Sequence, residues 1–573
     1  MKQLIVDLLK KEIHLKKEEI QNLIEIPPSP EMGDYSLPCF SLSKILHRSV
    51  YPKAQNEGAK KSPNQIAEEL KSKIKLPKQI KDVKVINGYL NFFIDKNILC
   101  EKIVKEILSK KEKFGKAKVK KEKIMIEFSQ ANTHKAFHIG HIRGTSIGES
   151  LARIMEFYGN KTIRANYQGD TGMHVAKWLW CYKKYHSREQ LKDDELWIAS
   201  IYVDAVKRLT QKPELQEEVN KLNKKLEDKK DKQLNLLWKK TRSLSLKSFE
   251  KIYSQLNTHF DKYFFESEVE KKGKEIAEKL LKKGIAKKSE GAVIVDLEKF
   301  NLGVWVLLRS DMTVLYSAKD LALAEEKFRK FKIDKNIYVV ADEQNLHMQQ
   351  LFKTLELMGF KSANKCRHVS YGIVRLPTGK MSSRTGDNIL YSDFINEIKK
   401  YAKKRIKERL EKISEKELEK RAEKISIAAI KYAMLKQNPN KNIIFNKKES
   451  LNFEGDTGPY LLYSYARASS ILRKAKIKQV KNFKIKDLNN KEVELAKKLS
   501  QFPEIVFSSY NNLNSSSIAN YSYQLSKIFS EFYHECPVIN SDNEQFRLAL
   551  VNCFRYVLKN SLNLLGINIL EEM

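Results

Sequence analysis

The segment from Ile124 to Asp170 most constrains how this chain folds, because it holds a strand-like, a helix-like and a second strand-like pattern in succession. Residues 124–128 form an apolar run with the length of a buried strand, and after a polar loop the apolar residues recur at helical spacing. Gly159 and Asn160 are typical of a helix end, and residues 163–167 are typical of the next strand. The pattern predicts a strand–helix–strand unit, the core of a nucleotide-binding α/β sheet.

The chemistry of this unit is expected at the junction of loop and helix, where the chain reads His138-Ile139-Gly140-His141. Free backbone N–H groups and the positive end of the helix dipole attract phosphates there, and Gly140 lets a flat purine approach the backbone. His138 and His141 lie on one helical face, so both can point at a triphosphate. Most His-x-x-His pairs are incidental, and a zinc site is disfavoured because no third ligand lies at a standard spacing. The strand–loop–helix context favours a nucleotide.

A second motif, Gly379-Lys380-Met381-Ser382-Ser383-Arg384, lies about 240 residues downstream. Together the two motifs resemble the His-Ile-Gly-His and Lys-Met-Ser-Lys-Ser signatures of class I aminoacyl-tRNA synthetases. Within that class, the flanking segments resemble the arginyl-tRNA synthetases, and the resemblance covers nearly the whole chain. These segments are EFSQANT at 127–133, NYQGD at 166–170, the helix from Tyr316 to Asp320, and FEGDTGPY at 453–460.

The resemblance implies an α/β fold, in which a class I Rossmann-like parallel sheet is joined by an N-terminal α+β domain and an all-α C-terminal anticodon-binding domain. The expected domains are residues 1–115 as the N-terminal tRNA-contacting domain, 116–183 as the first catalytic half, 184–290 as a mainly helical insertion, 291–395 as the second catalytic half with the Lys380 loop, and 396–573 as the helical anticodon-binding domain. Residues 292–295 and 304–308 are expected to continue the sheet, with 337–341 as another buried strand. Asn87-Gly88 indicates a hairpin.

Composition bounds the partners and the compartment. The chain carries 107 Lys and Arg against 71 Asp and Glu, a formal net charge of +36, so nucleic acid is the first candidate partner, although a general lysine bias gives the same excess. The six cysteines form no C-x-x-C pair, which argues against a disulfide framework and fits a reducing cytoplasm. Asp7 and Glu12 do not suit a signal or transit peptide. Since no run of about eighteen apolar residues occurs, no membrane span is expected.

The resemblance implies a two-step reaction, in which arginine and ATP form arginyl-adenylate with release of pyrophosphate, and tRNA then accepts the arginine. Neither step needs a covalent enzyme intermediate, so positioning and charge stabilisation are the main requirements. His138, His141 and Lys380 are expected to contact the phosphates. Gly140, Met381, Ser382 and Ser383 complete the expected ATP site. Mg²⁺ is expected to bridge phosphate oxygens, although the sequence identifies no protein ligand for it.

The second motif departs from the class pattern, because Ser383 replaces its second lysine. A positive charge is therefore missing where the transition state needs one. Lys135, three residues before His138, is placed to supply that charge from the opposite side, and Arg384 could also help. The ordinary alternative is that Lys135 is a solvated loop lysine. We expect its loss to cut adenylate formation by on the order of 10² or more.

Selection of arginine requires local carboxylates in a very basic protein, because a guanidinium pairs bidentately with a carboxylate. Tyr316 and Asp320 are four residues apart on one helical face. By resemblance, Asp320 takes the guanidinium and Tyr316 packs beside it, with Gln344 as a further polar contact. Glu127 and Asn132 are assigned by resemblance to the substrate around its α-amino group. The ordinary alternatives are that Asp320 pairs with a local lysine and that Tyr316 belongs to the core.

The expected partners are an arginine-accepting tRNA, L-arginine and ATP, for a monomer that works in the cytoplasm. Anticodon bases would stack on aromatic side chains of the C-terminal helices. The weakly supported candidates are Tyr460, Tyr463, Tyr465, Arg467, Tyr510, Tyr521 and Tyr533. Two alternatives remain open: a synthetase for another amino acid such as cysteine, and a tRNA-binding paralogue without catalysis, for which Ser383 leaves an opening. The sequence does not give the anticodon bases read, or whether activation waits for tRNA.

Overall fold

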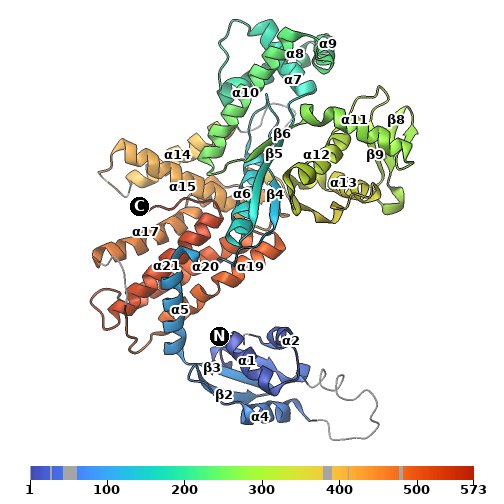
Figure 1. Ribbon diagram of the computed structural model, residues 1–573. Helices are drawn as coiled ribbons and strands as arrows, with labels where there is room; N and C mark the ends of the chain where they lie inside the picture. The colour runs from blue at the N-terminus through green and yellow to red at the C-terminus, as the bar shows by residue number, and fades with distance from the viewer. Residues whose placement is uncertain are drawn as a thin grey trace, which may run out of the picture. The chain divides into compact units, whose positions relative to one another are not determined.

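The computed structural model describes residues 2–573 apart from 26, 28, 43–60, 378–389, 409, 411 and 477–481, and the chain divides into two compact units (Figure 1). Unit 1 comprises Met1–Lys111, Gln479–Ser500 and Glu531–Cys553. Unit 2 comprises Glu112–Lys478, Gln501–Ser530 and Phe554–Met573. The C-terminal part of the chain therefore contributes segments to both units.

Unit 1 is built on an antiparallel sheet with the strand order β1-β3-β2. Asn87 and Gly88 join β2 to β3 with φ angles of 49° and 79°, the left-handed conformation that a tight two-residue hairpin requires, so the predicted hairpin is confirmed. Phe92 of β3 is buried in the core of this unit. The elements are α1 Lys2–Glu12, α2 Lys17–Leu23, β1 Tyr35–Pro38, α4 Pro63–Lys73, β2 Ile80–Ile86, β3 Tyr89–Ile94 and α5 Lys96–Lys110, joined by α18 Asn490–Ser500.

Unit 2 is organised around a parallel sheet with the order β11-β10-β4-β5-β6. The strands are β4 Lys123–Glu127, β5 Lys161–Gln168, β6 Lys262–Phe265, β10 Lys335–Ala341 and β11 Cys366–Tyr371. Helix α6, Ile139–Phe157, connects β4 to β5, as the strand–helix–strand pattern predicts. The strand order reverses between β4 and β10, and ligands of such sheets bind at the carboxyl ends of the strands beside that reversal.

Close packing of α6 on the chain after β4 explains one small residue of the helix. A Cβ atom at Gly148 would lie 2.1 Å from Cγ of Phe128, which is itself fully buried. Glycine therefore permits the helix to approach the end of β4 at a distance that no other residue allows. This contact holds the middle of α6 against the residue that directly follows β4.

Two expectations about the sheet are wrong. Residues 292–295 and 304–308 belong to β8, Ala292–Asp296, and β9, Val304–Leu308, which form a separate antiparallel sheet with β7, Lys287–Ser289. An apolar run alone does not distinguish a central parallel strand from an antiparallel strand that covers a helix. The strand that does continue the main sheet is β6, which lies within the segment expected to be a helical insertion. Its four residues are too short to give a clear period.

The helices surround these sheets in several groups. Helices α7 to α10 gather beyond one end of the parallel sheet in Figure 1, and their core includes Trp178, Trp197 and Trp238. The bounds are α7 Met173–Tyr185, α8 Glu195–Gln211, α9 Gln216–Asp228, α10 Lys232–Gln255, α11 Glu266–Lys282, α12 Tyr316–Phe331, α13 Asn345–Leu357, α14 Tyr391–Lys407, α15 Glu415–Leu435, α16 Lys447–Ser450, α17 Gly458–Lys474, α19 Phe502–Asn512, α20 Ser516–Glu535 and α21 Glu544–Leu564, with the short strands β12 Val374–Arg375 and β13 Ile443–Ile444.

The second half of α6 is bound to the C-terminal end of the chain. Ser150 Oγ donates a hydrogen bond to the carbonyl of Leu564 at 2.8 Å, and Arg153 Nη1 donates to Asn563 Oδ1 at 2.7 Å. Lys431 on α15 donates from Nζ to the carbonyl of Gly566 at 3.0 Å. Helix α6 therefore contacts the C-terminal segment directly, although more than four hundred residues of chain separate them.

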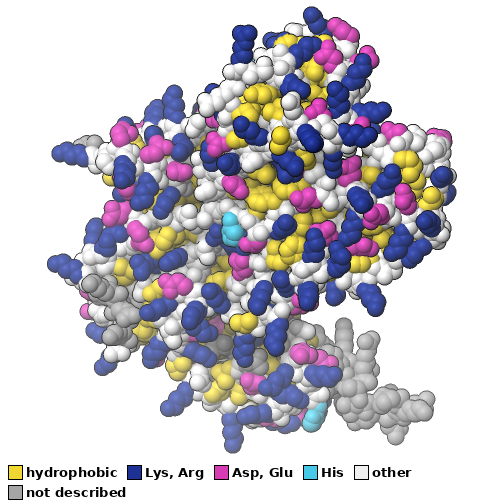
Figure 2. Space-filling model, turned by 45° about the horizontal axis from the view of Figure 1, so that its top comes forward, with side chains coloured by type: hydrophobic (Ala, Val, Ile, Leu, Met, Phe, Trp, Pro, Cys, Tyr) yellow, Lys and Arg dark blue, Asp and Glu magenta, His cyan; other side chains and the backbone are white. Residues whose placement is uncertain are grey.

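The positive charge of the chain is distributed widely over the face that Figure 2 shows. Figure 2 shows lysine and arginine side chains over the whole visible face, with acidic side chains between them and hydrophobic side chains in smaller areas. Among the described helices, none combines the length and the apolar character that a membrane span requires.

Candidate active site

The two motif histidines stack on each other at the start of α6. Their ring centres lie 3.8 Å apart, and His138 is the residue that caps the helix. The backbone N–H of His138 donates to Nδ1 of His141 at 3.2 Å. Because Nδ1 accepts, a neutral His141 carries its proton on Nε2, where it can donate to a phosphate oxygen.

Burial keeps these histidines neutral near pH 7. It lowers the pKa of His138 to about 4, with the charge of Lys135 adding to the effect, and it holds the pKa of His141 well below its usual value. Nδ1 of His138 is buried and has no hydrogen-bond partner among the described residues. A Cβ atom at Gly140 would lie 3.0 Å from Cε1 and Nδ1 of His138, so the glycine also makes room for this imidazole. The start of α6 thus presents neutral donors together with unused backbone N–H groups.

Lys135 lies in the loop before α6, within electrostatic range of both motif histidines. Its charge helps lower the pKa of His138, His141 and also His174. Its own pKa is lowered, first by burial and then by Lys177. A half-buried ammonium beside the phosphate-attracting end of α6 differs from an ordinary solvated lysine. The second-motif residues Lys380, Met381, Ser382, Ser383 and Arg384 lie outside the described part of the chain.

The acidic candidate residue Asp320 lies on α12 beside a histidine of the neighbouring helix. Nε2 of His347 on α13 lies 2.7 Å from Oδ2 of Asp320, whose side chain is 20% exposed. Tyr316 is 53% exposed, and its ring centre lies 4.7 Å from that of His347. Both ordinary alternatives therefore fail, because Asp320 contacts a histidine rather than a local lysine and Tyr316 is not in the core.

Three further carboxylates close to this region each contact a lysine or arginine. Glu127, at the end of β4, contacts the buried Lys327. Asp170 lies 2.6 Å from Arg242, and Glu266 lies 3.0 Å from Lys319. Burial, followed by the charges of Asp320, Glu266, Glu127 and Asp170, raises the pKa of the buried Tyr167 phenol well above its usual value. These carboxylates therefore lie within electrostatic range of one buried group.

The remaining predicted residues of the pocket occupy different environments. Glu127 is buried, and its second oxygen accepts a hydrogen bond from Gln130 at 3.1 Å. Asn132 lies beside Gly169, where an added Cβ would be 2.3 Å from its Oδ1 and 3.1 Å from Oε1 of Glu266. Gln344 is exposed and precedes the first residue of α13. The structure thus brings Asn132 close to Glu266.

Glu266 and His347 are the residues of this region that sequence reasoning missed. Glu266 directly follows β6, the unexpected strand, so it was hidden by the assignment of its segment to an insertion. His347 lies three residues after Gln344, and that short spacing after a predicted strand was the available signal. Among the anticodon candidates, Tyr465 and Tyr521 are buried, whereas Tyr533 is exposed.

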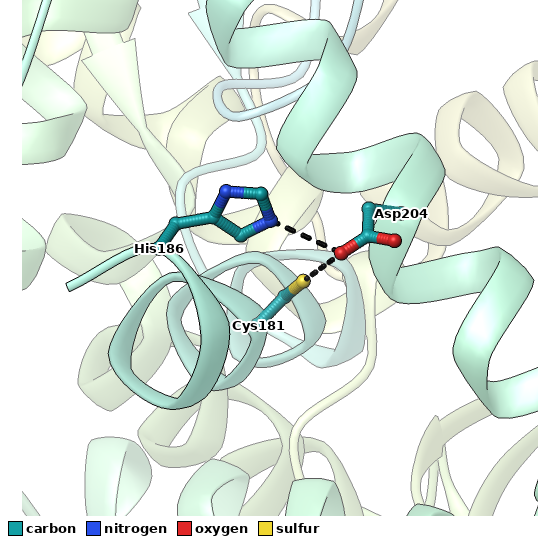
Figure 3. Close-up of side chains that lie close together, drawn as sticks. All are labelled: Cys181, His186 and Asp204. Carbon is teal, nitrogen blue, oxygen red and sulfur yellow. Dashed lines mark hydrogen bonds and ion pairs between the residues drawn. The ribbon is translucent and has the colours of Figure 1, made fainter. Parts of the chain in front are cut away.

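Cys181, His186 and Asp204 form the group of described residues whose ligand atoms lie close enough to hold a metal ion (Figure 3). Sγ of Cys181 and Nε2 of His186 lie 3.4 and 3.0 Å from Oδ2 of Asp204. That same oxygen accepts a hydrogen bond from Nε of Arg208 at 2.7 Å, and a permanent cation in this position opposes a metal ion. Burial, followed by Asp204, raises the pKa of Cys181 to about 12. We interpret the group as a hydrogen-bond network between α7 and α8.

Models of three protein families match successive parts of the chain. Residues 1–94 match the arginyl tRNA synthetase N terminal domain, and residues 103–447 match the class I (R) tRNA synthetase catalytic domain. Residues 461–573 match the DALR anticodon binding domain.

Full-length relatives and solved structures agree with these models. The arginine--tRNA ligases of Clostridium perfringens and Clostridium kluyveri are 37% and 38% identical over 580 residues, covering 100% of each chain. The Thermus thermophilus arginyl-tRNA synthetase structure has a TM-score of 0.80 at 26% identity, covering 100% of this chain and 99% of that chain. A Plasmodium falciparum arginyl-tRNA synthetase structure, 23% identical, has the same fold with a TM-score of 0.76 over 96% of this chain and 94% of that chain. On the evidence of its catalytic domain and of relatives alike along their full length, the chain belongs to the arginyl-tRNA synthetase family of class I aminoacyl-tRNA synthetases.

Proposed function

We propose that this chain activates L-arginine with ATP to form arginyl-adenylate, releases pyrophosphate, and transfers the arginine to its tRNA. The start of α6 would hold the phosphates, and the region around Asp320 would hold the amino acid. The observation that carries the proposal is the charge pattern of the acidic region. Glu127, Asp170 and Glu266 each contact a lysine or arginine, whereas Asp320 contacts the imidazole of His347 and remains partly exposed, which leaves a side for a substrate cation.

The nucleotide would be bound mainly by neutral hydrogen-bond donors. His141 would donate from Nε2, and His138 and the first backbone N–H groups of α6 would meet the phosphates as charge develops on them. Gly140 would leave room for the purine, and the second-motif residues Lys380, Met381, Ser382 and Ser383 would complete the ATP site. Mg²⁺ prefers oxygen ligands and would be held through phosphate oxygens. The Cys181 group does not suit it, because two of its three side chains offer a thiol and an imidazole.

Lys135 would supply the positive charge that Ser383 does not provide. Its position near His138 and His141, seen in its effect on their pKa values, supports this role. Asn132 would contact the arginine substrate beside Glu266, with Tyr316 over its side chain and Gln344 at the pocket entrance. Glu127 would act near the α-amino group while held by Lys327 and Gln130. The chain would work as a monomer in the cytoplasm, where its six free cysteines stay reduced.

The test is arginine-dependent exchange of pyrophosphate into ATP by the purified chain, with and without an arginine-accepting tRNA. We expect exchange with L-arginine and none with L-lysine or L-cysteine in its place. Asp320→Asn preserves the shape of the side chain but removes its charge, and we expect the KM for arginine to rise ~10²-fold or more while the KM for ATP stays within about twofold. An unchanged arginine KM would reject the pocket assignment. Absence of exchange with intact tRNA binding would favour a tRNA-binding paralogue.

A further inference from the structure

Three side chains from three elements form a hydrogen-bonded chain behind the pocket. Nε1 of Trp305, on β9, donates to Nδ1 of His347 on α13 at 3.3 Å. Nε2 of the same imidazole lies 2.7 Å from Oδ2 of Asp320 on α12. Trp305 and His347 are both buried. These hydrogen bonds therefore connect the small antiparallel sheet to the carboxylate that we assign to the arginine pocket.

The hydrogen bond from Trp305 fixes the tautomer of His347. An indole N–H can only donate, so Nδ1 of His347 accepts and carries no proton. A neutral imidazole then has its proton on Nε2 and donates it to Asp320. Because Nδ1 of His347 accepts the indole N–H, the imidazole that holds Oδ2 of Asp320 brings no positive charge to it.

We propose that Trp305 and His347 are positioning residues that orient the Asp320 carboxylate for a planar cation without neutralising it. The inference rests on the proposed function, in which Asp320 receives the guanidinium of arginine. Bidentate pairing requires the plane of the carboxylate to be fixed as well as its charge to be present. A lysine or arginine in place of His347 would fix the plane but cancel the charge, as happens at Glu127 and Glu266.

The proposal also gives the small antiparallel sheet a role. Trp305 faces inward from β9, while its neighbour Val304 is exposed. The sheet thereby brings a donor to the back of a histidine that lies on α13, outside the sheet. Arginine selection thus depends on β9 as well as on the helices that carry Asp320 and His347.

Three variants test the hydrogen bonds from Trp305 through His347 to Asp320 in the pyrophosphate-exchange assay. Trp305→Phe keeps an aromatic ring and removes only the indole N–H, and we expect the KM for arginine to rise roughly 3–10-fold. His347→Leu removes both contacts, and we expect a rise of roughly 10–100-fold. His347→Gln replaces Nε2 with an amide donor, and we expect it to recover most of that loss. The kcat and the KM for ATP should change less than about twofold in all three.

A double variant separates positioning from general packing. If Trp305 acts through His347, Trp305→Phe should add little to the effect of His347→Leu. A matched control is Trp197→Phe, which removes a buried indole N–H from Glu189 in the helical insertion and should leave the arginine KM unchanged. Equal effects of Trp305→Phe in both backgrounds, or a parallel loss of ATP binding, would overturn the proposal.

Asp320→Asn distinguishes failure of this inference from failure of the proposed function. If Asp320→Asn leaves the arginine KM unchanged, the pocket assignment and the positioning role fail together. If Asp320→Asn raises that KM strongly while Trp305→Phe and His347→Leu retain the wild-type value, the pocket assignment stands and only the positioning role is rejected.

Discussion

The nucleotide end of the site, at the start of α6, and the acidic end, around Asp320, differ in how far apart along the chain their residues lie. His138 and His141 contact each other across three residues. Asp320 and His347 are separated by 27 residues, and Glu266 and Lys319 by 53. A site built within one helical turn is visible as a sequence motif. A site assembled from several elements is visible only once the fold brings those elements together.

The two ends also differ in charge. At the nucleotide end, burial lowers the pKa values of the histidines, so the groups that we propose to meet the phosphates are neutral apart from Lys135. At the acidic end the site is lined by carboxylates. Three of them, Glu127, Asp170 and Glu266, each contact a lysine or arginine. Changes at the first end should therefore alter kcat for activation, and changes at the second should alter the KM for arginine.

The largest effect that would sharpen this comparison is expected for Lys135→Ala. Loss of one electrostatic contact to the transition state should reduce kcat for pyrophosphate exchange ~10²-fold or more, with little change in the arginine KM. Lys177→Ala is a matched control, because Lys177 is a neighbouring cation on α7 with no expected contact to the phosphates. Near-normal activation by Lys135→Ala would show that the missing lysine of the second motif is compensated elsewhere.

A smaller effect is expected for Gly140→Ala. The added methyl would press on the imidazole of His138, from which it would be separated by 3.0 Å. A displaced donor should lower kcat roughly 10-fold, while arginine binding measured by calorimetry stays unchanged. A change confined to the arginine KM would break the proposed division between the two ends.

At the acidic end, Glu266→Gln should raise the KM for arginine about 10-fold, because it leaves the charge of Lys319 unbalanced beside the pocket. The double variant Glu266→Gln/Lys319→Met removes both charges and distinguishes two roles of Glu266. A return of the KM toward the wild-type value would mean that Glu266 serves to balance Lys319. A KM that stays high would mean that Glu266 itself contacts arginine.

The smallest effect concerns stability in acid, and it should arise mainly at the nucleotide end. Burial lowers the pKa values of His134 and His174 to about 3 and that of His138 to about 4. Between these values and pH 6.5 the unfolded chain binds more protons than the folded chain. The contribution of the neutral histidines to the free energy of unfolding is therefore fully present above pH 6.5 and is lost as the pH falls toward 4. Each histidine contributes up to about 1.4 kcal/mol per pH unit.

Urea unfolding between pH 7.5 and 5 measures this dependence. His134→Gln should reduce the slope of unfolding free energy against pH. His259→Gln, at an exposed histidine, is the matched control. Equal slopes for the wild type and His134→Gln would contradict the assignment of the effect to buried histidines.

Local patterns predicted much of the fold, whereas long-range pairing did not follow from them. The strand–helix–strand unit and the Asn87-Gly88 hairpin were predicted because spacing and turn residues determine them. The position of β6 was not predicted, since four residues carry no period, and the apolar runs of β8 and β9 were assigned to the wrong sheet. The same limit applies to the site, where His138 and His141 were found from their motif but His347 and Glu266 were not.

The contact of α6 with the end of the chain has a consequence for protein engineering. The helix has 19 residues and is therefore about 28 Å long. It begins after His138, and Ser150, beyond its middle, donates a hydrogen bond to the carbonyl of Leu564. A tag, a truncation or a fusion at the C-terminus should therefore alter the support of the helix whose first turn carries the proposed phosphate donors. Removing the last ten residues should therefore affect activity, although it removes no residue of the site.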